Sequence, residues 1–233
     1  MVDRSVRLEG YANARELGGL PLSGGGVTPR RVFLRSESPD LLPPASWERL
    51  RDYGVRTIVD LRRADERAGD RGTRPHWAAV VTVDLHDAAF DERHWDDGLV
   101  GTALHYLEFL LEPPIAAVLE TIADAEPGAV LVHCVGGRDR TGLVSALLLA
   151  IVGVETEAIV DDYLESVRNA PALAALQGVP NWEPNVSRLL ADRGTSTEKS
   201  FRAFLAGLDV DAVLDAVTPA RAEALRTWRG GLL

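Results

Sequence analysis

A short apolar run, a glycine-rich turn and a second apolar run follow one another directly past the middle of the chain. The run 129–133 has the length and composition of a buried strand, and 141–152 has those of a buried helix. The turn between them contains Cys134, Gly136 and Gly137 and ends at Arg140. A strand that enters a helix through a tight turn is typical of a parallel β-α-β unit, so this feature indicates an α/β fold.

The rest of the chain shows the same alternation of strands and helices. Apolar β-rich runs predict strands at 32–34, 56–62 and 79–85, and helical spacing predicts helices over 43–53 and 104–125, the latter interrupted by Pro113-Pro114. We therefore predict an α/β fold with a central, mainly parallel sheet flanked by helices.

From about residue 155 onward the chain reads as helices, with breaks at Pro171, 178–184, 194–197 and 218–219. These extra C-terminal helices either form a lid over the site or simply pack against the core, and the sequence leaves both open. No linker or repeat divides the chain, so we expect one domain, 1–233.

The turn after the predicted strand has the properties of an anion-binding loop. Backbone N–H groups of a loop that opens a helix point into one concavity, and glycines allow the backbone to approach a ligand closely. Arg140 can give two parallel hydrogen bonds to phosphate oxygens. The candidate phosphate-binding residues are His133, Val135, Gly136, Gly137, Arg138, Thr141 and Gly142.

Cys134 is the candidate nucleophile. The field at a helix N-terminus beside an arginine favours the thiolate, which is the reactive form of cysteine. Loop amides and Arg140 would stabilise the charge of a transferring phosphoryl group. The Thr141 hydroxyl can hydrogen-bond the sulfur as it departs, and His133 would orient the loop by hydrogen bonds instead of acting as a base.

Composition excludes several other classes of protein. The formal net charge of −10 argues against a general nucleic-acid or membrane-surface binder, which needs a broad basic face. A single cysteine excludes an intramolecular disulfide, and the histidines lack metal-ligand spacing, so we expect no cofactor and no metal. No apolar run is long enough to span a membrane and no signal core opens the chain, so we expect a cytoplasmic protein, with leaderless secretion left open.

The segment His133-Cys134-x-x-Gly-x-Asp139-Arg140-Thr141-Gly142 resembles the phosphate-binding loop of the protein tyrosine phosphatase superfamily. In addition, 13–19, Asn-Ala-Arg-Glu-Leu-Gly-Gly, is similar to the N-terminal Asn-x-Arg-Asp-Leu-Gly-Gly of its bacterial tyrosine and lipid phosphatases. Glu16 departs from that motif, and Arg138 stands where the group often has lysine. The resemblance covers roughly 8–170 and implies a phosphatase-like fold and hydrolysis of phosphomonoesters through a Cys134 thiophosphate.

The general acid that protonates the leaving oxygen has several candidates. The resemblance suggests Asp139, although flanking arginines would lower the pKa of a carboxyl there, which is unfavourable for a proton donor. Asp60 ends a predicted strand that can lie beside the loop, where α/β folds place their sites. Asp87, Asp96 and Asp97 lie in a polar segment where other phosphatases carry a mobile acid, but a solvated acidic loop is the simpler interpretation.

The resemblance leaves the substrate class open. Phosphotyrosine in proteins is the first expectation, with dual specificity or phosphoinositides as alternatives, so the expected partner is a phosphorylated protein or a phosphoinositide. Sulfur transfer and arsenate reduction also use a cysteine in an anion-binding loop, but the arginine spacing and the lack of further cysteines disfavour them. A non-catalytic phosphate-binding module would be expected to lack the cysteine or the arginine. The oligomeric state stays open.

Overall fold

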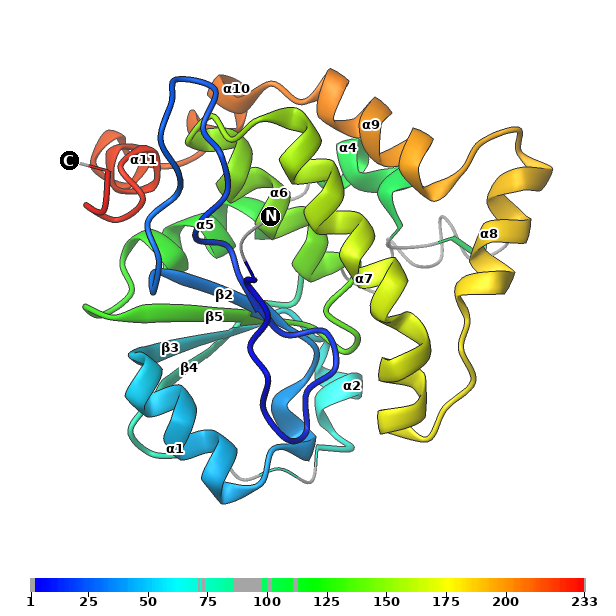
Figure 1. Cartoon of the computed structure of the whole chain (residues 1–233). Helices are drawn as coiled ribbons and strands as arrows, with labels where there is room; N and C mark the ends of the chain where they lie inside the picture. The colour runs from blue at the N-terminus through cyan, green and yellow to red at the C-terminus, as the bar shows by residue number, and fades with distance from the viewer. Residues whose placement is uncertain are drawn as a thin grey trace.

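The computed structural model describes residues 3–70, 72, 74–85, 98–99, 102–110 and 113–232. Its centre is a five-stranded sheet in the order β1-β2-β5-β3-β4 (Figure 1). The strands are β1 (Arg15–Glu16), β2 (Phe33–Ser36), β3 (Val55–Asp60), β4 (Ala79–Thr82) and β5 (Ala129–His133). Among the five described strands, only β1 pairs in the antiparallel sense, so the mainly parallel sheet expected from the sequence is confirmed.

Strand β5 lies in the middle of the sheet, between β2 and β3, and all five of its residues are buried. A strand covered on both faces needs a continuous apolar run, which is what Ala129–His133 supplies. The register places His133 beside Ser36 of β2 and Asp60 of β3. Parallel strands end at one edge, so the loop after β5 lies between the ends of its two neighbours.

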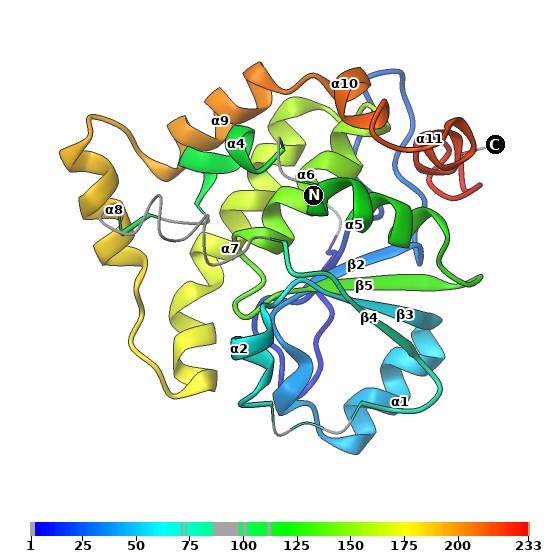
Figure 2. The ribbon, with the colours of Figure 1, turned by 180° about the vertical axis from the view of Figure 1, so that it is seen from behind.

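Helices cover both faces of the sheet (Figures 1 and 2). On one face, α1 (Pro44–Tyr53) buries Trp47 and Leu50 against Ile58 and Leu131 of the strands. On the other face, α5 (Pro114–Ala123) and α6 (Arg140–Ile151) contribute to the larger apolar core. Ten of the twelve residues of α6 are buried, as expected for a helix that is apolar all round.

The C-terminal helices lie outside α5 and α6 and extend past the sheet edge (Figures 1 and 2). They are α7 (Thr156–Gln177), α8 (Glu183–Asp192), α9 (Thr197–Gly207), α10 (Val210–Leu214) and α11 (Pro219–Arg226). Shorter elements are the 3-10 helices at Pro39–Leu41 and Ala103–His105, with α2 (Ala64–Arg67) and α4 (Tyr106–Phe109). Within the described residues, none of the helices is both long and apolar enough to cross a bilayer.

One predicted helix break is wrong. Helix α7 runs through Pro171 without interruption and ends at Gly178, which adopts a left-handed conformation with φ of 67°. A proline inside a helix removes one backbone hydrogen bond. Burial of Leu173 and Ala174 in the turn that follows keeps this segment helical.

Candidate active site

The loop Cys134–Asp139 follows β5 directly, and α6 begins at Arg140, as the sequence predicts. Carbonyl oxygens of this loop accept hydrogen bonds from donors outside it: Ser38 N to Val135 O at 2.8 Å, Asn13 Nδ2 to Gly136 O at 3.0 Å, Arg35 Nη2 to Gly137 O at 2.7 Å, and the Tyr106 hydroxyl to Asp139 O at 2.7 Å. Within the described part of the chain, the backbone N–H groups of 135–140 donate to no protein acceptor. The loop therefore turns these four carbonyls toward neighbouring segments, while its amides stay without a protein acceptor.

Gly137 is needed at its position for two reasons. Its φ is 66°, and a Cβ atom there would lie 2.4 Å from the backbone of Ser36 and Glu37 at the end of β2. Any side chain would thus clash with the neighbouring strand as well as strain the backbone. Close contact between loop and strand end is what holds the loop in its turned conformation.

Cys134 is buried, with 3% of its surface exposed. Its carbonyl oxygen lies 3.1 Å from Nδ1 of His133, which is fully buried. Burial lowers the pKa of His133 to about 4, so the ring is neutral at pH 7 and Nδ1 must carry the hydrogen that it donates. His133 thus contacts the backbone at the start of the loop, and its role in orienting the loop stays a prediction.

Thr141 and Gly142 lie in the first turn of α6 and are both buried. The Thr141 hydroxyl has no hydrogen-bond partner among the described residues, including the Cys134 sulfur. The bond from threonine to sulfur that the sequence suggested is therefore not formed here. Gly142 packs against the Tyr163 ring of α7, where a Cβ would lie 2.8 Å from a ring carbon.

Arg140 is held by the carboxylate of Glu66, a contact that the sequence did not predict. Its Nη2 donates to Glu66 Oε1 at 2.7 Å and its Nη1 donates to Glu66 Oε2 at 2.5 Å, a bidentate pair, while Nη1 also lies 3.2 Å from the Leu61 carbonyl. Burial would raise the pKa of Glu66, but the hydrogen bonds from Arg140 outweigh it and the pKa lies below its usual value. Glu66 lies on α2, just past the end of β3, and only the fold places that helix beside the loop.

The two described candidates for the general acid differ in their surroundings. Asp60 is 2% exposed and binds Arg62 through both oxygens, at 2.9 Å from Nε and 2.7 Å from Nη2. Burial would raise the pKa of Asp60, but the hydrogen bonds from Arg62 outweigh it and the pKa is lowered, so this carboxyl stays ionised. Asp139 has a side chain that is 33% exposed at the start of α6. The third candidate group, Asp87, Asp96 and Asp97, lies outside the described residues.

Arg138 contacts residues of the C-terminal helices. Its Nη1 lies 2.6 Å from Asp139 Oδ1, its Nη2 lies 2.7 Å from Glu183 Oε1, and its guanidinium carbon is 5.9 Å from the centre of the Tyr163 ring. Burial raises the pKa of Glu183. The loop is thus joined to the first residue of α8 by an ion pair that the sequence did not predict.

A buried carboxylate on α7, Asp162, gathers three arginines beneath the loop. Arg4, Arg15 and Arg35 approach its two oxygens at 2.7, 3.0 and 2.7 Å. Arg35 also donates to the Gly137 carbonyl and Arg15 donates to Asn13 Oδ1, while Asn13 in turn holds the Gly136 carbonyl. Burial would raise the pKa of Asp162, but Arg15 and Arg35 outweigh it and keep the carboxylate ionised. The N-terminal Asn-x-Arg motif is therefore structural support for the loop.

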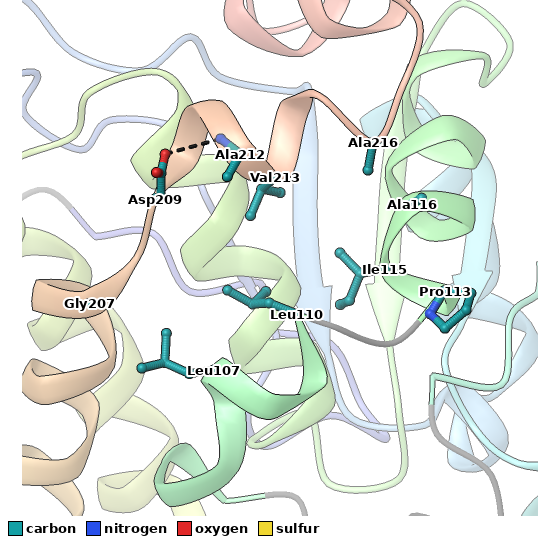
Figure 3. A pocket seen from close by; sticks show the side chains of 10 residues that line it. All are labelled: Leu107, Leu110, Pro113, Ile115, Ala116, Gly207, Asp209, Ala212, Val213 and Ala216. Atoms are coloured by element: carbon teal, nitrogen blue, oxygen red, sulfur yellow. Dashed lines mark hydrogen bonds between the residues drawn. The ribbon is translucent and has the colours of Figure 1, made fainter.

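The apolar pocket in Figure 3 lies elsewhere, between α4, α5 and the α9–α10 turn. Its volume is about 370 Å³ and leucine, isoleucine, valine and alanine side chains line most of it. Its one carboxylate, Asp209, accepts a hydrogen bond from Ala212 N at 3.0 Å and caps α10. No nucleophile or cation lines this pocket among the described residues. Nor does any cluster of three or more histidine, cysteine or acidic residues able to hold a metal occur in the described ranges.

Comparison with known proteins agrees with this geometry. A model of the tyrosine phosphatase family matches residues 6–227. The chain is 32% identical over 217 residues to a provisionally named tyrosine-protein phosphatase of Cupriavidus necator. The match covers 84% of this chain and 77% of that protein. It is 47% identical over 184 residues to the triple specificity protein phosphatase PtpB of Mycobacterium tuberculosis, over 64% of this chain and 65% of PtpB.

Among solved structures, TpbA of P. aeruginosa matches with a TM-score of 0.42 and 21% identity, over 79% of this chain and 85% of that one.

Proposed function

Because the chain belongs to the tyrosine phosphatase family, whose members are phosphoric monoester hydrolases, we propose that it hydrolyses phosphotyrosine in polypeptides through a covalent thiophosphate on Cys134. The observation that carries this proposal is the loop itself. Its outward carbonyls leave the amides of 135–140 for three phosphate oxygens, with Cys134 at the start of the loop and Arg140 at its end.

In the first step, the Cys134 thiolate attacks phosphorus and forms the S–P bond while the bond from phosphorus to the tyrosine oxygen breaks. The electron pair leaves with that oxygen, which takes a proton from Asp139. Arg140, fixed by Glu66, and the loop amides stabilise the charge on the three equatorial oxygens. We assign the acid to Asp139, whose side chain is 33% exposed and is held by Arg138 through one oxygen, since Asp60 is buried, ionised and held by Arg62 through both oxygens.

In the second step, water attacks phosphorus and passes a proton to the Asp139 carboxylate, and the S–P bond breaks to return the thiolate and release phosphate. Microscopic reversibility makes the acid of the first step the base of the second. His133 takes no proton in this sequence. It donates Nδ1–H to the Cys134 carbonyl and so positions the nucleophile.

Phosphotyrosine is placed ahead of phosphoinositides for an electrostatic reason. PtpB is named for triple specificity, and a phosphoinositide headgroup bears several negative charges that need cations beyond the one phosphate site. Arg138, the other arginine of the loop, is already paired with two carboxylates, Asp139 and Glu183. We therefore propose phosphoserine, phosphothreonine and phosphoinositides as secondary substrates. Membership of the tyrosine phosphatase family makes sulfur transfer and arsenate reduction the disfavoured alternatives to phosphate hydrolysis.

The test is hydrolysis of p-nitrophenyl phosphate by wild-type protein and by Cys134→Ser, with chelator present. We expect turnover that resists the chelator and vanishes in the variant, together with a stoichiometric burst of nitrophenol in rapid mixing, which reports the covalent intermediate. Turnover that survives in Cys134→Ser would overturn the assignment. Turnover without any burst, under conditions where the second step is slow, would contradict the thiophosphate.

A further inference from the structure

A hollow of about 230 Å³ lies directly beside the phosphate loop. Gly136, Arg138 and Asp139 of the loop form one wall, the second half of α7 forms another, and the connection from α7 to α8 forms the third. It is separate from the pocket of Figure 3 and contains neither Cys134 nor Arg140. A group bound in it would therefore adjoin the phosphate without occupying the phosphate site.

The wall opposite the loop is apolar. Leu173 and Ala174 of α7 are buried at its base, and Gly136, which has no side chain, faces Leu173, so that a Cβ there would lie 3.6 Å from a Leu173 methyl. At the rim, Val179 is 49% exposed and Trp182 is 65% exposed. Tryptophan is enriched among the residues that contribute most to binding energy, and here it adjoins an apolar hollow instead of standing alone on the surface.

Two more exposed apolar side chains come from the same segments, Val135 at 38% and Leu176 at 37%. Gln177 Nε2 lies 3.5 Å from the Val135 carbonyl, which places the end of α7 against the start of the loop. The apolar rim is thus continuous with the catalytic loop.

The polar end of the hollow has no free cation among the residues that line it. Arg138 is the arginine there, and its guanidinium is shared between Asp139 and Glu183 at 2.6 and 2.7 Å. With Asp139 protonated as the general acid, Arg138 and Glu183 leave this wall without net charge. A second phosphate would find no free cation there, whereas an uncharged side chain needs none.

We propose that this hollow is a specificity subsite that receives an apolar side chain flanking the phosphotyrosine of a polypeptide substrate. The inference rests on the proposed function and adds to it the kind of sequence preferred. The volume suits one leucine or phenylalanine side chain, since a pocket for a whole small ligand is larger, roughly 300 Å³ or more. Acyl chains of a membrane are the less favoured occupant, because the protein carries a formal charge of −10 and the hollow offers no free cation for an anionic lipid surface.

The experiment compares phosphotyrosyl peptides in which leucine replaces alanine at each flanking position in turn. We expect wild-type protein to prefer leucine at one position by about tenfold or more in kcat/KM, the range that one apolar pocket provides. Trp182→Ala removes part of the rim and Ala170→Phe fills the hollow from α7, so both should bring the leucine-to-alanine ratio toward one. Val27→Ala, an exposed apolar residue of the N-terminal segment, should keep the wild-type ratio.

The ratio is taken within each variant, so a general loss of activity does not imitate the effect. Equal rates on leucine and alanine peptides, with normal p-nitrophenyl phosphate turnover, would overturn the subsite and leave the proposed function intact. A preference that persists in both Trp182→Ala and Ala170→Phe would overturn it as well. An effect of these variants confined to phosphoinositide in vesicles would assign the hollow to lipid instead. Failure of wild-type protein on every phosphomonoester would remove both proposals.

Discussion

At the scale of single residues, we expect replacement of aspartate by asparagine to have different effects at Asp139 and at Asp60. A general acid matters most when the leaving oxygen is a poor leaving group. Asp139→Asn should therefore lower kcat by about 10²–10⁴ for phenyl phosphate and distinctly less for p-nitrophenyl phosphate. Asp60→Asn should instead destabilise the protein, because Arg62 would be left with a weaker partner. Steady-state rates on both esters decide the question, and equal losses on both in Asp139→Asn would remove it as the acid.

In the proposed reaction, Glu66 acts through Arg140. Its bidentate contact fixes the plane of the guanidinium, so Glu66→Gln should lower kcat/KM about tenfold or more and weaken inhibition by inorganic phosphate. The neighbour Asp65, whose carboxylate contacts Arg63 and is 66% exposed, provides the control Asp65→Asn. Comparable losses in the two variants would show that α2, and not this ion pair, supports the site.

The lowered pKa of His133 predicts that the stability of the protein depends on pH. Its pKa is about 4 in the folded protein and near 6.5 when unfolded, so the unfolded state binds the proton at higher pH. The contribution of His133 to the free energy of unfolding is complete above about pH 6.5 and is lost as the pH falls toward 4. At pH 5 the loss is about 2 kcal/mol. Urea unfolding at pH 7 and pH 5 should show a smaller difference in His133→Gln than in wild type. An unchanged difference would mean that other groups dominate this range.

At the scale of elements, the most informative contact is between α7 and the loop. Asp162→Asn would leave Arg4, Arg15 and Arg35 buried without their shared carboxylate, at a cost of about 3–5 kcal/mol in the free energy of unfolding. It should also weaken phosphate binding, because Arg35 supports the Gly137 carbonyl. Asp161→Asn, exposed on the same helix turn, is the matched control for a thermal melt. A melt of Asp162→Asn equal to that control would mean that the cluster contributes no stability.

Local pattern was enough to predict some elements and not others. Strand β5 and helix α6 were predicted within one residue, because an apolar run bounded by a glycine-rich turn is read locally. The 104–125 segment was correctly divided by Pro113-Pro114 into α4 and α5. The predicted helix break at Pro171 was wrong, because burial of Leu173 and Ala174 offsets the lost backbone hydrogen bond. That burial depends on tertiary packing, which local pattern does not show.

The same distinction applies to the site. Cys134, Arg140 and the loop between them lie in one short segment, so the sequence alone places them together. Glu66, Asp162 and Glu183 come from three separate helices, and only the fold brings them to the loop. Their spacing in the chain carries no signal of that contact.

At the scale of the whole molecule, the C-terminal helices are part of the main core. Trp228 is fully buried, lies edge-on to Phe33 of β2 at 4.6 Å between ring centres, and donates its Nε1–H to the Pro29 carbonyl at 3.1 Å. Phe201 of α9 stacks on Tyr163 of α7 at 4.0 Å. These contacts support the single domain predicted from the sequence, which we propose for 1–233.

If the chain is a single domain, we expect it to unfold in one step, and a substitution near residue 228 should lower the stability of the whole protein. Trp228→Ala, close to the C-terminus, should cost about 3–5 kcal/mol through the cavity beside Phe33 and lower the Tm of the whole protein. Trp182→Ala is the matched control, because that side chain is 65% exposed and its loss leaves no cavity. Far-UV circular dichroism and tryptophan fluorescence should then give one coincident transition in each variant. Two separated transitions in Trp228→Ala, with loss of helix first and loss of phosphate binding only later, would mean that the C-terminal helices form a unit of their own.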